Sequence, residues 1–136
     1  MTASLMVEDE YDRYDAVGLA GLIASSELAP AELIEAAISR IESRNPKLNA
    51  VISTCFDAAR DSVSRGLPAG PLAGVPYLVK DLNTLLAGVP ATNGSRAFSD
   101  TIPPSDGVLV SRLKAAGLVI LGKTNTPEFG LNICTA

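Results

Sequence analysis

The sequence predicts an α/β fold in which helices cover a β-sheet. Two observations carry this prediction: helical and strand-like segments alternate along the second half of the chain, and the strand-like segments there are almost uniformly apolar. At 136 residues and 47% hydrophobic content, the chain is long enough to bury one core. It contains no internal repeat or low-complexity tract. We therefore expect one domain or part of one.

Three helices are expected in the first half of the chain. Apolar residues recur at helical spacing over residues 16–25, where Asp15 is available as the amino-terminal cap. A second helix begins at Pro30, carries an apolar stripe along one side, and is expected to stop at Asn45-Pro46. A third is expected over residues 56–65.

One further helix is expected in the second half. Ser105 is placed to cap a helix over residues 106–116, and Gly117 is placed to close it in the left-handed conformation. Four residues of this helix are expected to point inward: Val108, Leu109, Leu113 and Ala116. The helix then precedes an apolar strand, as α/β layering requires.

Three short strands are expected, over residues 48–54, 77–80 and 118–121. The second of these is expected to be buried on both faces. The Gly/Pro-rich stretch 66–76 before it is expected to be a loop with fixed bends. A second irregular region, residues 87–95, leads to a short turn.

Composition excludes several functional classes. The net charge of −4 and the absence of tryptophan leave no basic patch or aromatic platform for direct contact with nucleic acid. No run of about 18 apolar residues is present, so no membrane span is expected. The acidic amino terminus lacks a basic region followed by a long apolar stretch, and we expect a cytoplasmic protein.

The chain contains no histidine, which restricts its chemistry. A Ser-His-Asp or Cys-His relay and a histidine-ligated metal are excluded, so a hydrolase of this sequence needs another proton carrier. The two cysteines, Cys55 and Cys134, lie far apart without CxxC spacing and are expected to be buried small apolar residues.

Lys80 is the best-placed proton carrier. It ends the apolar run that begins at Tyr77 and lies between two Gly/Pro-rich segments. Lysines at strand ends usually extend their amine into solvent. From the residues alone, Lys80 could therefore also be an ordinary surface lysine without a catalytic role. A lysine can act as a base only when its amine is neutral, which requires desolvation. Asp81 is expected to point to the opposite face and to bond elsewhere.

Other nucleophile candidates are weaker. Ser95 follows Gly94 in an expected turn and has no GxSxG frame around it. Cys134 with Glu128 and a lysine is similar to the Cys-Glu-Lys sites of nitrilase-type amidohydrolases, but the order and context differ.

Residues 117–124 match the phosphate-loop pattern GxxxxGK[ST]. The four intervening residues are large and apolar, which is typical of a strand, and Pro127 prevents a helix from starting at Lys123. We therefore expect Lys123 at the end of a strand, paired with a carboxylate, and Thr126 as the cap of a short turn with Pro127 at its first position.

Four blocks of residues together resemble the amidase signature family. They are Gly70–Pro76 with Val79-Lys80-Asp81, Thr92–Ser95, Ala115–Asn125, and Pro127-Glu128-Phe129. The resemblance implies the amidase signature fold, a mixed sheet covered by helices on both faces. It further implies that residues 1–136 form the amino-terminal portion of a single domain, with a helical lead-in over about 1–66 and the first sheet strands over about 70–136.

The same resemblance implies a mechanism. A lysine, acting through a serine held by a cis peptide bond, deprotonates a second serine that attacks the carbonyl of a small-molecule amide, without cofactor or metal. Lys80 matches that lysine. Both serines belong to a Gly/Ser-rich segment expected beyond Ala136, so we expect truncation before it and an inactive isolated chain. One departure is Leu82, where many members have asparagine, which here stands at Asn83.

Three functions remain open from the sequence. The first is an amidase acting on linear or cyclic amides, whose missing carboxyl-terminal part completes the domain. The second is the A subunit of glutamyl-tRNA(Gln) amidotransferase. The third is a non-catalytic remnant or scaffold. The substrate is not determined, and a homo-oligomer is compatible with the sequence.

Overall fold

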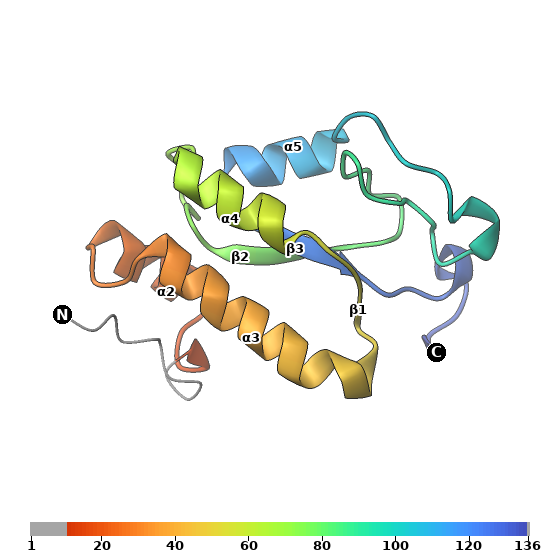
Figure 1. Cartoon of the computed structure of the whole chain (residues 1–136), viewed down its shortest axis with the longest axis horizontal. Helices are drawn as coiled ribbons and strands as arrows, with labels where there is room; N and C mark the ends of the chain where they lie inside the picture. Colours follow the sequence, from red (N-terminus) through yellow and green to blue (C-terminus); the bar gives the residue numbers. More distant parts are fainter. Residues whose placement is uncertain (1–10, 136) are drawn as a thin grey trace.

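The computed structural model describes residues 11–135 and contains one mixed three-stranded sheet (Figure 1). The strands are β1 (Val51–Thr54), β2 (Pro76–Lys80) and β3 (Val119–Thr124), in the order β1-β3-β2. β2 runs parallel to the central strand β3, and β1 runs antiparallel to it. The predicted α/β class with a mixed sheet is confirmed.

Helices cover both faces of this sheet. They are α2 (Ala16–Ala24), α3 (Pro30–Leu48), α4 (Phe56–Arg65) and α5 (Val108–Ala115), with the short 3₁₀ turns η1 (Arg96–Phe98) and η2 (Glu128–Gly130). Val119 and Leu121 of β3 pack against Ile34 and its neighbours on α3 and α4, whereas Ile120 packs with Val110 of α5. Successive residues of a strand point to opposite faces, so β3 contributes to two separate apolar clusters.

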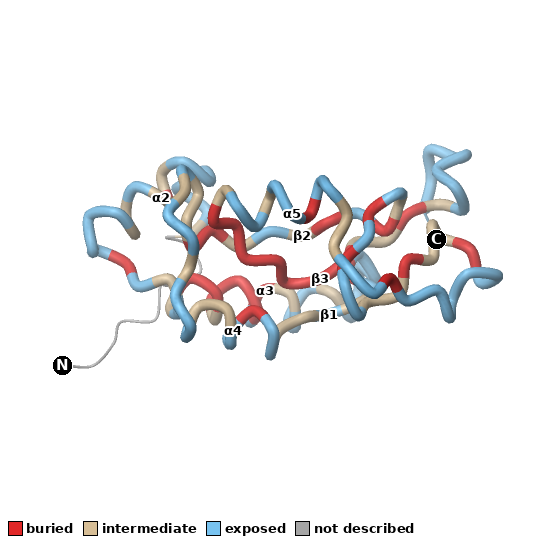
Figure 2. Tube along the Cα trace, turned by 90° about the horizontal axis from the view of Figure 1, so that it is seen from above, coloured by how far each residue is buried: buried red, intermediate tan, exposed pale blue. Residues whose placement is uncertain are grey.

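β3 is the most deeply buried element in the described part of the chain (Figure 2). Its first five residues are all buried, because it has a strand on each side and helices above and below. Residues from its carboxyl half are therefore held in the interior of the molecule, and this half includes Lys123.

Within residues 11–135, no helix combines the length and the apolar character that crossing a bilayer requires.

The predicted end of the second helix at Asn45-Pro46 is wrong. α3 continues through Pro46 to Leu48 and closes at Asn49, which adopts the left-handed conformation at φ 48°. A proline in the last turn leaves the carbonyl four residues earlier, that of Glu42, without its helical donor, and water can hydrate this carbonyl because Glu42 is exposed. The following strand accordingly begins at Val51 and not at residue 48.

The predicted start of the last helix is also wrong. α5 begins at Val108 with Gly107 as its cap, and Ser105 lies outside it. Val108 and Leu109 are exposed, and Val110 is the residue that packs into the core. Val110 and the partly buried Leu113 lie three residues apart and so share the face that packs on the sheet, as expected for Leu113, whereas Val108 and Leu109 lie off that face.

β2 is not buried on both faces as expected. It is an edge strand of the sheet formed by the described residues, with Tyr77 43% exposed and Lys80 exposed. Of its residues only Val79 is fully buried, in the cluster with Val110 and Ile120. The apolar run predicted a strand correctly. Which faces and edges of that strand are covered depends on the strands and helices that pack beside it.

Burial along α3 predicts a contrast between two leucines. Leu33 is fully buried and Leu48 is 67% exposed on the same helix. Leu33→Ala is expected to lower the free energy of unfolding by about 2–5 kcal/mol, because it leaves a cavity. Leu48→Ala is expected to change it by less than about 0.5 kcal/mol. Urea titrations followed by circular dichroism measure both, and equal midpoints for the two variants would contradict the packing described.

Candidate active site

The candidate site lies where the parallel strands β2 and β3 end. Lys80 is the last residue of β2 and pairs with Thr124, the last residue of β3. In α/β folds, ligands bind outside the carboxyl ends of parallel strands. The Lys80 side chain is exposed, and within residues 11–135 no group lies within hydrogen-bonding distance of its ammonium. Its amine is thus not committed to any contact in the described part of the chain.

Asp81 follows Lys80 directly and is 1% exposed. Its carboxylate accepts hydrogen bonds from the backbone N–H of Thr92 at 3.1 and 3.2 Å, from the Thr92 hydroxyl, and from the Lys123 ammonium at 2.5 Å. The prediction that Asp81 bonds to groups other than Lys80 is confirmed. Asp81 joins the end of β2 to the loop and to β3.

Lys123 is completely buried. Its ammonium donates to Asp81 Oδ1 at 2.5 Å, to the Pro90 carbonyl at 2.9 Å and to the Thr84 carbonyl at 3.1 Å. An ammonium has three protons, so every donor has an acceptor. The predicted pairing with a carboxylate is confirmed, although Lys123 lies within β3 and not at its end.

This arrangement also settles the phosphate-loop match. Residues 119–124 form a strand, and the Lys123 ammonium is already surrounded by acceptors. A phosphate loop needs a curled backbone that opens into a helix. The match has no structural counterpart here.

Hydrogen bonds between side chains and backbone N–H groups hold the loop that follows Asp81. The Thr92 hydroxyl accepts from the Gly94 N–H at 3.1 Å, and the Asn93 side chain accepts from the Asn83 N–H at 2.7 Å. Both asparagines have positive φ, near 50°. Asparagine tolerates this conformation better than most residues do. Sequence analysis missed the role of Thr92, because its partner Asp81 is eleven residues away along an irregular segment.

A cavity of about 500 Å³ opens beside this loop. Eight residues line it: Gly94, Asn125, Thr126, Pro127, Glu128, Leu131, Asn132 and Cys134. Gly94 has φ 72°, and a Cβ atom there would lie 2.6 Å from the Thr126 carbonyl oxygen. The loop and the segment after β3 therefore approach as closely as glycine allows. Lys80 is not among the residues that line this cavity.

The weaker nucleophile candidates have different surroundings. Ser95 is 5% exposed and precedes η1, so its hydroxyl is hardly accessible to a substrate. Cys134 is exposed, which contradicts the expected burial. It shares the cavity lining with Glu128, but no lysine is part of that lining. Thr126 is not the cap of the following turn, because Pro127 occupies that position and Thr126 donates to the Pro127 carbonyl at 3.2 Å.

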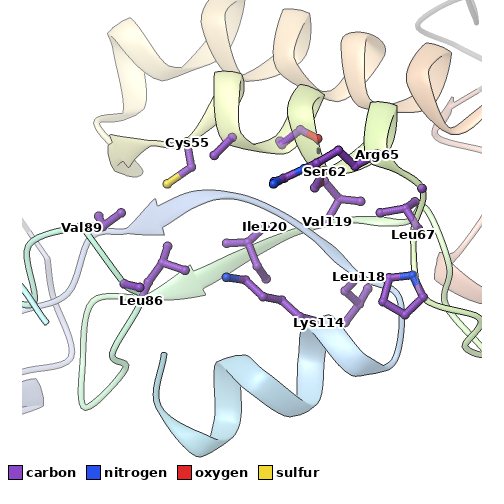
Figure 3. Close-up of a pocket in the computed structure, with 15 residues that line it drawn as sticks. Cys55, Ser62, Arg65, Leu67, Leu86, Val89, Lys114, Leu118, Val119 and Ile120 are labelled. Atoms are coloured by element: carbon purple, nitrogen blue, oxygen red, sulfur yellow. Dashed lines mark hydrogen bonds between the residues drawn. The ribbon is translucent and has the colours of Figure 1, made fainter. Parts of the chain in front are cut away.

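A second cavity, of about 430 Å³, lies between α4 and α5 over β3 (Figure 3). Cys55 lies at its wall beside Val89 and Leu86, and most of the remaining lining is apolar. Burial raises the pKa of the Cys55 thiol, and the positive charges of Lys114 and Lys123 offset this only in part. The thiol is therefore protonated near neutral pH and behaves as a half-buried small apolar group.

The fold and the blocks around Lys80 are those of amidase signature proteins. The family model described as Amidase matches residues 32–136. Because this match covers most of the sequence, the chain belongs to the amidase signature family.

Individual relatives agree with this assignment. The chain is 44% identical over 129 residues to the A subunit of glutamyl-tRNA(Gln) amidotransferase from Salinispora tropica, covering 90% of this chain and 26% of that protein. It is 42% identical over 123 residues to "6-aminohexanoate-cyclic-dimer hydrolase" of Paenarthrobacter ureafaciens, covering 89% and 24%. A solved structure of 6-aminohexanoate cyclic dimer hydrolase superposes with a TM-score of 0.83 at 40% identity, covering 90% of this chain and 25% of that one. The chain spans about a quarter of the length of these relatives.

The buried ion pair predicts a strong effect on stability. Lys123→Met is expected to lower the free energy of unfolding by about 3–5 kcal/mol, because it leaves the Asp81 carboxylate buried without its cation. The matched control is Lys114→Met, which removes a 2.6 Å pair with Asp106 whose lysine is 46% exposed. That change is expected to cost less than about 1 kcal/mol. Comparable shifts in the urea midpoint for both variants would contradict the assigned burial.

The two cysteines are expected to react at different rates. The raised pKa of Cys55 lowers its thiolate fraction at pH 8, and the thiolate is the reactive form. Cys134 is exposed and is expected to react faster with a disulfide reagent. Single-cysteine variants Cys55→Ala and Cys134→Ala allow each rate to be measured spectrophotometrically. A faster reaction in the variant that retains Cys55 would contradict the half-buried environment described for that thiol.

Proposed function

We propose that this chain is the lysine-bearing part of an amide hydrolase, in which Lys80 is the terminal base of a Ser-cisSer-Lys relay. The observation that carries the proposal is the contrast between two neighbouring lysines. Lys123 is buried with all its protons donated, whereas Lys80 ends β2 with an amine that has no partner among residues 11–135. Of the two, only Lys80 is available to accept a proton from another group.

The proposed chemistry needs no imidazole. Neutral Lys80 accepts the proton of the bridging serine, which takes the proton of the nucleophilic serine as its oxygen attacks the amide carbonyl. The proton then passes to the leaving amine, and water hydrolyses the acyl-enzyme by the same relay. This route is consistent with a sequence that has no histidine.

Both serines are proposed to lie beyond Ala136, in the Gly/Ser-rich segment that the family resemblance implies. A neutral amine requires desolvation, and Lys80 is exposed in this chain. The serine-bearing segment is therefore proposed to cover Lys80 as well as to supply its partners. It follows that the isolated 136-residue chain is expected to hydrolyse no amide.

The proposed substrates are small linear or cyclic amides. This is supported by the 42% identity to a relative named as a cyclic-dimer hydrolase. A second candidate is the A subunit of glutamyl-tRNA(Gln) amidotransferase, supported by the 44% identity to a protein of that name. Two values this close do not separate the candidates.

An activity assay separates them. Turnover of simple amides by a single full-length chain favours the hydrolase, whereas ammonia release from glutamine that depends on partner subunits favours the amidotransferase. A non-catalytic scaffold predicts neither activity. A gene sequence that continues beyond codon 136 into a Gly/Ser-rich segment would support an enzyme, and a stop codon at that point would support the scaffold.

Replacing Lys80 tests the proposed base. In the full-length protein, Lys80→Met is expected to reduce kcat by at least about 100-fold, in the range that general bases contribute. The melting temperature is expected to change little, because methionine replaces the lysine stem at similar volume and Lys80 has no partner in the described residues. Lys47→Met, an exposed lysine of α3, is the control and is expected to retain activity. Full activity of Lys80→Met would remove Lys80 from the mechanism.

A further inference from the structure

Building on the proposed function, we propose that Lys123 and Asp81 are positioning residues for Lys80. Neither touches a substrate in this proposal. Their buried ion pair fixes the end of β2, which carries Lys80, and the loop of residues 82–94 that follows it. The pair would then act on the reaction through geometry alone.

The first step of the argument is the attachment of β2. Lys80 pairs with Thr124, and the Asp81 N–H donates to the Thr124 carbonyl at 3.0 Å. The Asp81 carboxylate is held from two directions, by Lys123 of β3 and by Thr92 of the loop. The backbone on the carboxyl side of Lys80 is therefore anchored through both the main chain and a side chain. An anchor at the adjacent residue restricts where the Lys80 side chain originates.

The second step is the control of the loop by one ammonium. Lys123 donates to the carbonyls of Thr84 and Pro90, which lie six residues apart on the loop. The Asp81 carboxylate holds Thr92, and the Thr92 hydroxyl accepts from the Gly94 N–H. Gly94 lines the 500 Å³ cavity. A continuous set of contacts thus runs from Lys123 to the wall of the cavity.

The third step concerns the choice of residue. An apolar pair of similar volume can be as stable as a buried ion pair, so stability alone does not require charges here. Apolar contacts are not directional, however, and an apolar side chain at position 123 would leave the Thr84 and Pro90 carbonyls without this donor. Three directional bonds from one buried ammonium hold the Asp81 carboxylate and the Thr84 and Pro90 carbonyls in place relative to β3. Proton transfer needs such definition, since a displacement of about 1 Å can reduce a rate about 100-fold.

The test uses the full-length enzyme and the double variant Lys123→Met/Asp81→Asn. Removing both charges avoids the unpaired buried ion that each single variant would leave. We expect a folded protein whose melting temperature is closer to the parent's than that of Lys123→Met, a kcat for a chromogenic anilide about 100-fold lower, and a KM within about threefold. If the ion pair only stabilised the fold, kcat would return to the parental value in any variant whose melting temperature does. Recovery of parental kcat in the folded double variant would overturn the proposal.

Two further variants complete the experiment. Thr92→Val removes the hydroxyl contact and leaves the ion pair, so it carries the test if the double variant does not fold. Its kcat is expected to fall about tenfold at unchanged KM. Parental kcat in this variant would also overturn the proposal. Lys80→Met in the same assay separates the two hypotheses: if it is active, the proposed function fails, and if it is inactive while the double variant has parental kcat, only the positioning role fails.

Discussion

The ion pair between Lys123 and Asp81 connects the central strand of the sheet to the loop that follows β2. It joins the interior of β3 to the end of β2, and through Thr92, Thr84 and Pro90 it holds the irregular loop that follows. A loop of this kind cannot form a strand ladder, so its carbonyl groups need other donors once they are buried. The ammonium provides a donor for the carbonyls of Thr84 and Pro90. One buried charge inside the sheet therefore ties this part of the loop to β3.

That charge can lie inside because β3 occupies the centre of the sheet. Its alternating side chains build two apolar clusters, one against α3 and α4 and one against α5. At its carboxyl half the apolar side chains give way to Lys123, whose register partner Val79 belongs to the α5 cluster. The cost of burying the ammonium is offset by a carboxylate and two carbonyls in direct contact. Lys80 lies one residue further along β2, outside this enclosed region and exposed.

Sequence patterns predicted most elements and failed where local rules compete. The third helix has its predicted bounds, and Asp15 caps α2 through the Gly18 N–H as expected. Pro46 did not end α3, because it lies in the last turn, where the loss of one backbone hydrogen bond is tolerated and Asn49 closes the helix. Lys123 was expected to have an acidic partner, but its identity was not predictable. Asp81 is 42 residues away and meets it only because the two strands are parallel and adjacent.

By itself, the sequence determined the class of fold, the family and the lysine that could serve a histidine-free hydrolase, because periodicity, composition and motif spacing are local properties of the chain. Tertiary structure decided which side chains are covered. It made β2 an edge strand and placed Val110, not Val108, in the core. It also buried Lys123 while leaving Lys80 exposed. Two lysines that look alike in sequence differ because strand order and register set the neighbours of each one, and those long-range contacts are not encoded by any single segment.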